Sequence, residues 1–119
     1  MTNYSADARF RRVSGPHGWG WVLADGPHGH IVGTSAVYHP TVHACRHSID
    51  LTQSAPLHRL RVTGSDLGGW GWELVDDYGR PLAQSVTSYG DRTRARSEMM
   101  LFRRVAVRAA PAGAPSARP

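Results

Sequence analysis

The chain has 119 residues, of which 40% are hydrophobic and 19% are charged. This length and composition predict one packed globular domain, long enough to need no metal or disulfide, and they exclude a disordered chain. All 14 basic residues are arginine and nine residues are acidic, so the net charge is +5 and a phosphate-rich partner has to be considered. We attribute the absence of lysine to the codon preference of a G+C-rich genome.

The sequence predicts a soluble cytoplasmic protein without a membrane partner. No apolar run approaches the roughly 20 residues that cross a bilayer, and the stretch MTNYSADARFRRV lacks the apolar centre of a signal peptide. The single cysteine, Cys45, excludes an intrachain disulfide and a zinc site built from several cysteines.

The first predicted unit covers residues 9–56 and follows a flexible N-terminus, residues 1–8. RFRRV indicates a first strand. In WGWVL, large apolar residues occupy every second position. This strict alternation predicts a second strand, with Trp19, Trp21 and Leu23 on one face. A glycine-containing turn, DGPHGH, then leads into a third strand, IVGTS.

A helix is expected after the third strand, because Pro40 suits a first helical turn. Val42, Cys45 and Ile49 gather on one side of this helix, which predicts that they face the core. Cys45 could form a nucleophilic pair with a nearby histidine. We favour a small core residue instead, because burial raises the pKa of a thiol and lowers its reactivity.

The second predicted unit, residues 57–108, repeats this order. HRLRVT alternates as a half-buried strand, and WGWEL places Trp70 and Trp72 on one face of the next. The turn DDYGR leads into the third strand, PLAQS. Asp91 is a good N-cap for the following helix.

The tail, residues 109–119, is predicted to be disordered, because PAGAPSARP has no apolar periodicity. Residues 60–107 can be laid over residues 10–56 with two one-residue gaps. Tyr38 then falls on Tyr89. The other matches include Trp19 with Trp70, Trp21 with Trp72, Ser35 with Ser85 and Ala44 with Ala95.

The predicted fold is therefore α+β, with two tandem β-β-β-α repeats that form antiparallel sheet packed against two helices and together make one domain. The aromatic residues that recur in both units are expected in or beside the core: Trp19, Trp21, Tyr38, Trp70, Trp72 and Tyr89.

The second unit resembles a known repeat. WGWEL at residues 70–74, GRPLAQS at residues 79–85, Tyr89 and Ala95 are similar to the pattern of the YegP-like family of bacterial and archaeal proteins. The resemblance spans about residues 9–107. It implies the same β-β-β-α repeats and no particular activity, because the family is a domain of unknown function.

Two groups of side chains are candidates for ligand binding. His39, His43 and His47 recur every four residues, a spacing that suits a metal ion, but we interpret them as solvated surface residues. The second group is a stripe of arginines on the second helix, a candidate for phosphate binding: Arg92, Arg96, Arg103 and Arg104.

The sequence contains no convincing enzyme site. Ser35 and Ser85 stand at strand ends without a nucleophile elbow, and Asp76 and Asp77 occupy a turn. We therefore predict a protein without catalytic residues or cofactor, acting as an interaction module that associates with itself as a homodimer. The alternative is sequence-nonspecific nucleic-acid binding through the arginines of the second helix and tail.

Overall fold

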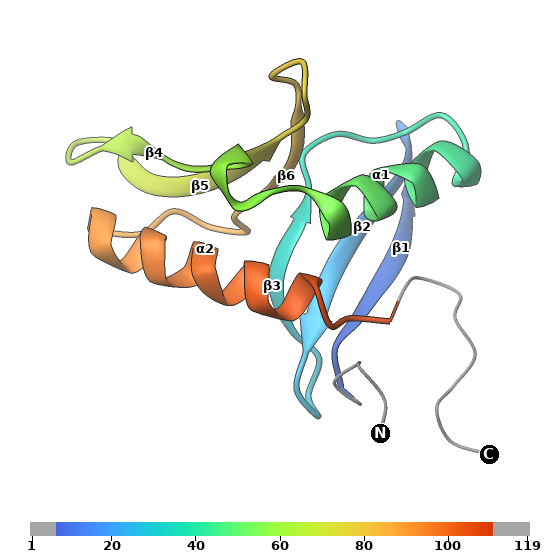
Figure 1. The fold of residues 1–119 in the computed structure, drawn as a ribbon, viewed down its shortest axis with the longest axis horizontal. Coiled ribbons are helices and arrows are strands. Elements are labelled where there is room, and N and C mark those ends of the chain that lie inside the picture. Colours follow the sequence, from blue (N-terminus) through green and yellow to red (C-terminus); the bar gives the residue numbers. More distant parts are fainter. Residues whose placement is uncertain (1–6, 111–119) are drawn as a thin grey trace.

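The computed structural model describes residues 7–110, which form one sheet and two long helices (Figure 1). The elements are β1 (Arg9–Gly15), β2 (Gly18–Asp25), β3 (His30–Ser35), α1 (Val42–Ser54), the short 3-10 helix η1 (Leu57–Arg59), β4 (Leu60–Ser65), β5 (Gly69–Val75), β6 (Pro81–Gln84) and α2 (Arg92–Ala106). Each half of the chain thus contains three strands followed by a helix. Within residues 7–110, no helix is long and apolar enough to span a bilayer.

The six strands form a single antiparallel sheet in the order β1-β2-β3-β6-β5-β4. The two halves meet where β3 pairs with β6, with Thr34 opposite Gln84 and Ser35 opposite Ala83. This confirms the predicted α+β class, an antiparallel sheet packed against two helices. The topology also leaves β1 and β4 at the two edges of the sheet.

Strict alternation in β2 and β5 directs every second side chain toward the helices. Trp21 and Leu23 of β2, and Trp72 and Leu74 of β5, have at most 2% of their surface exposed. The outer members of the two pairs are half-buried: Trp19 packs against the same cluster, whereas the indole N–H of Trp70 donates to Asp66 Oδ1 at 2.9 Å.

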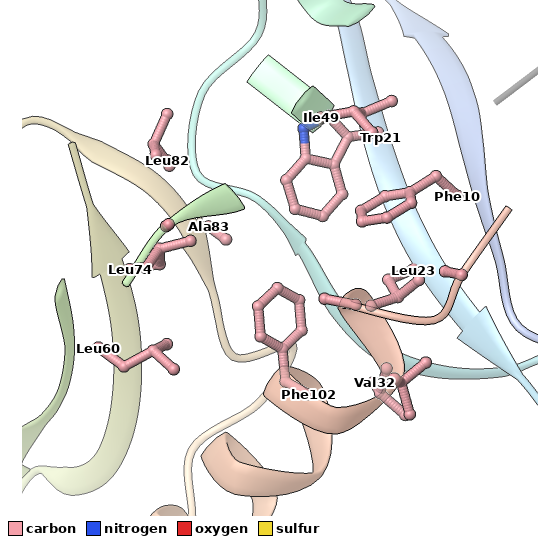
Figure 2. Close-up of a cluster of buried hydrophobic side chains, with 14 of the residues drawn as sticks. Phe10, Trp21, Leu23, Val32, Ile49, Leu60, Leu74, Leu82, Ala83 and Phe102 are labelled. Carbon is pink, nitrogen blue, oxygen red and sulfur yellow. The ribbon is translucent and has the colours of Figure 1, made fainter. Parts of the chain in front are cut away.

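The core is one continuous cluster to which both helices contribute, so both lie on the same face of the sheet. Figure 2 shows Phe102 of α2 at its centre, between Leu23 of the first half and Leu74 of the second. The Phe102 ring lies 4.4 Å from that of Trp72. A Cβ atom at Gly33 would overlap the Phe102 ring, so only glycine fits beneath it.

Each long helix begins directly after a residue whose side chain caps it. Thr41 Oγ1 accepts the N–H of Ala44 at 3.0 Å, and Asp91 Oδ1 accepts the N–H of Arg94 at 2.7 Å. The expected N-cap Asp91 is therefore present. In the first half, Thr41 is the cap and α1 begins at Val42, so Pro40 precedes the helix rather than opening it.

Backbone pairing corrects the expected match between the two halves by one residue. Trp19 exchanges two backbone hydrogen bonds with His39, and Trp70 does the same with Tyr89. His39 therefore corresponds to Tyr89, and Tyr38 corresponds to Ser88. This explains why the ring of Tyr38, expected beside the core, is 50% exposed, whereas Tyr89 packs against the core.

The same shift changes the match along the helices. Cys45, rather than Ala44, corresponds to Ala95, and both Cys45 and Ala95 are fully buried. The two N-caps, Thr41 and Asp91, are related by the same spacing.

The ordered domain extends past the expected boundaries at both ends. Ala8 and Ala109, expected in the flexible ends, have 2% and 0% of their surface exposed. Ala110 accepts the N–H of Phe10 at 3.0 Å and donates to Ala8 at 3.1 Å. Gln53 Nε2 donates to the carbonyls of Ala106 and Ala109, both at 3.0 Å. The remainder of the predicted flexible ends, residues 1–6 and 111–119, lies outside the described residues.

We expect Trp72→Ala to destabilise the domain by about 3–5 kcal/mol, because it removes a buried ring that packs against Phe102. Tyr78→Ala is the matched control, since this ring is 83% exposed and should change stability by less than about 0.5 kcal/mol. Urea unfolding of both variants measures the difference. Equal midpoints for the two would contradict the core assignment.

Candidate functional site

The three candidate histidines are not brought together with other ligand-type side chains in residues 7–110. His39 precedes α1, while His43 and His47 lie on the exposed side of the helix. No group of three or more histidine, cysteine or carboxylate side chains in residues 7–110 could hold a metal ion. Burial lowers the pKa of His39, which favours its neutral imidazole.

Cys45 lies in the core under β2. It is fully buried, and its Sγ donates to the carbonyl of Gly20 at 3.3 Å. Desolvation raises the pKa of the thiol, an effect that the charge of Arg12 partly offsets. Since His43 and His47 are exposed, the structure does not bring this thiol to either helical histidine.

The arginine stripe on α2 is divided between two roles. Arg103 is half-buried, and its guanidinium donates to the carbonyl of Ala55 just after α1. It therefore joins the two helices instead of facing a ligand. The other three arginines of the stripe are exposed: Arg92, Arg96 and Arg104.

The two consecutive aspartates have structural roles at the β5–β6 turn. Asp76 Oδ1 accepts the backbone N–H groups of Tyr78 at 2.8 Å and Arg80 at 2.9 Å. Desolvation raises the pKa of Asp76, but these bonds and the ion pair with Arg80 outweigh it, so the pKa is lowered overall. Asp77 forms an ion pair with Arg59 at 2.9 Å.

A groove of about 300 Å³, which no pattern in the sequence predicts, lies between α1 and the β5–β6 turn. Its two arginines, Arg59 and Arg80, are the ones paired with Asp77 and Asp76, so their charges are compensated. The remaining wall is largely apolar and includes Leu51, Ala55, Pro56, Val75 and Leu82.

The edge strand β4 presents backbone groups to solvent. The backbone of Trp72 faces Ser85, the residue directly after β6: its carbonyl accepts the N–H of Ser85 at 3.0 Å and its own N–H donates to Ser85 Oγ at 3.3 Å. Val62 lies opposite Trp72 in the β4–β5 ladder. Hydrogen-bonded and non-hydrogen-bonded pairs alternate in an antiparallel ladder, so the N–H and C=O of Val62 point away from the sheet.

The opposite edge of the sheet, β1, lies beside another segment of the chain and carries more charged residues than β4. Ala110 lies beside β1, where it bridges to Arg9 and accepts the N–H of Phe10. Strand β1 also carries Arg9, Arg11 and Arg12. Strand β4 carries a single charge, Arg61, whose guanidinium is paired with Glu73 at 2.6 Å.

The architecture defines an α+β protein in which a twisted antiparallel sheet carries two helices on one face. The solution structure of the protein of unknown function yegP from E. coli shares this fold, with a TM-score of 0.75 and 14% identity over 92% of this chain and 97% of that one. The UPF0339 protein from Shewanella oneidensis is similar, with a TM-score of 0.72 and 13% identity over 88% of this chain and 91% of that one.

This structural likeness supports the resemblance to the YegP-like family found in the sequence, at the level of the fold. No family model and no curated protein matches the sequence.

We expect Cys45 to react with a thiol reagent such as DTNB only when the domain unfolds, because the sulfur is buried and its pKa is raised. The rate of modification should rise with urea in parallel with the unfolded fraction. A fast reaction in native buffer would show that the thiol is accessible and would revive the nucleophile hypothesis.

Proposed function

We propose that this chain is a non-enzymatic interaction module that associates with a second copy of itself through β4. The observation that carries the proposal is the outward-facing backbone of Val62 on an edge strand whose single charge is neutralised. An uncovered edge is a template for pairing with another strand, and a two-fold symmetric contact is the commonest form of self-association.

Side chains favour one register for this pairing. If Val62 lies opposite its own copy, the two residues can exchange both backbone hydrogen bonds. Leu60 then lies opposite Gly64, and Arg61 lies opposite Thr63. This register keeps the two Arg61 side chains from facing each other directly, which would be destabilising. Pairing through β1 would instead bring together two strands with three arginines each.

Charge substitutions at Thr63 test the register, because this side chain is exposed on β4 and would face Arg61 of the second copy. Thr63→Arg should weaken the dimer and Thr63→Glu should strengthen it. Two such pairs form per dimer and each is worth about 0.2–1 kcal/mol, so Kd should change by about 2- to 30-fold.

Sedimentation velocity over a range of micromolar concentrations measures the effect. A chain that remains monomeric throughout this range would contradict self-association. A dimer that responds equally to both substitutions would contradict the β4 register.

A second candidate function is sequence-nonspecific binding to nucleic acid. It is favoured by the exposure of Arg92, Arg96 and Arg104 and by the absence of a carboxylate within 4.0 Å of any of them among the ion pairs of residues 7–110. Such a surface binds phosphates and releases counterions, so affinity should fall steeply with salt.

We expect any binding to mixed-sequence DNA or RNA to weaken by orders of magnitude between ~50 and ~200 mM salt if many phosphate contacts form. The combined substitution of Arg92, Arg96 and Arg104 by alanine should reduce it, whereas Arg80→Ala, which removes an arginine paired with Asp76, should have little effect. Fluorescence anisotropy at the two salt concentrations measures this. No binding at low salt eliminates this candidate.

A further inference from the structure

The face of the sheet opposite the helices carries two hollows in equivalent positions. The lining of each includes the glycine between a pair of tryptophans, Gly20 in β2 and Gly71 in β5. A Cβ atom on Gly20 would lie 2.9 Å from Ser35 Oγ, and one on Gly71 would lie 2.8 Å from Ser85 Oγ. The two glycines therefore have matching surroundings.

One of the two hollows is covered by an aromatic ring from the same chain. The ring of Tyr38 passes over the first hollow, and its Cε1 would lie 3.2 Å from a Cβ on Gly15 and 3.3 Å from one on Gly20. The corresponding residue in the second half is Ser88, which reaches Gly69 but does not approach Gly71 within 4 Å of such an added atom.

The sizes of the hollows agree with this difference. The hollow beside Tyr38 has a volume of about 220 Å³, whereas the one beside Ser88 measures about 410 Å³. The lining of the larger hollow includes three glycines and five uncharged polar residues, which are Thr63, Gln84, Ser85, Thr87 and Ser88.

We propose that the hollow over Gly71 binds the phenol ring of a tyrosine presented by a protein partner. This rests on the proposed interaction module and names a second surface with its anchor residue. The ring of Tyr38 beside Gly20 shows that a tyrosine side chain fits against the equivalent surface of the first half. The exposed side chains of Gln84, Thr87 and Ser88 offer hydrogen-bonding groups to the phenol hydroxyl.

Charge favours a tyrosine over a nucleobase as the occupant. The residues that line the hollow include Glu73 and no arginine, and the neighbouring Arg61 is already paired with the Glu73 carboxylate at 2.6 Å. A nucleotide would bring a phosphate to a wall that supplies no unpaired cation, whereas tyrosine brings no charge. Tyrosine is also a common anchor at protein interfaces, because it buries a large rigid area and keeps a polar end.

NMR titration with p-cresol, the side chain of tyrosine, tests the site directly. In amide correlation spectra of the full chain, millimolar p-cresol should shift the signals of Gly69, Gly71 and Ser88. The saturated analogue 4-methylcyclohexanol, which is not planar, should shift them much less. No shift with p-cresol, or equal shifts with both compounds, would overturn the proposal. Larger shifts with adenosine monophosphate than with p-cresol would overturn the choice of tyrosine.

Substitutions at the equivalent positions Tyr38 and Ser88 supply matched variants. Ser88→Tyr should cover the hollow and abolish the shifts, whereas Ser88→Asn is too small to cover Gly71 and should retain them. Tyr38→Ser should uncover the first hollow and add shifts at Gly15 and Gly20. Unchanged p-cresol shifts in Ser88→Tyr would place the binding elsewhere and contradict the proposal.

These outcomes are separable from the test of self-association. Because Thr63 also lines the hollow, the p-cresol titration uses the chain without Thr63 substitutions. If that chain is monomeric but still shows the p-cresol shifts, the β4 dimer is lost and the tyrosine site is kept. A β4 dimer without p-cresol shifts would lose only the tyrosine site.

Discussion

The packing of the Phe102 ring against Gly33 is the contact on which the whole domain depends. Phe102 belongs to the last helix, yet it fills the space beneath a strand of the first half and packs against Trp72 of the second. The sheet itself joins the halves through only the short β3–β6 pairing. A side chain at position 33 would displace the ring that bridges them, so glycine here is a packing requirement.

The contact between Phe102 and Gly33 has no counterpart of the same residue types in the other half. Gly33 corresponds to Ala83, and Phe102 corresponds to Thr52, which is buried and bonds back to the carbonyl of Ser48 at 2.8 Å. One half therefore contributes a large ring to the shared core and the other contributes a small residue.

Local patterns in the sequence were sufficient for the strands, the buried Trp21 and Trp72 and the Asp91 cap, because period and capping depend on neighbouring residues. The position of Tyr38 could not be found this way. Two tyrosines invite a match, but backbone pairing aligns His39 with Tyr89 and leaves Tyr38 outside the core. Likewise, Arg103 looks like part of a surface stripe until α1 brings the carbonyl of Ala55 to it.

The candidate surfaces were less predictable than the fold for a related reason. Strand order decides that β4 is an edge, and the hollow over Gly71 exists because Ser88 replaces a ring. The meeting of Ala8 and Ala110 has a different consequence. With the entry and exit of residues 8–110 side by side, the domain is a closed unit that could be inserted into a surface loop of another protein, or circularly permuted, without a long linker.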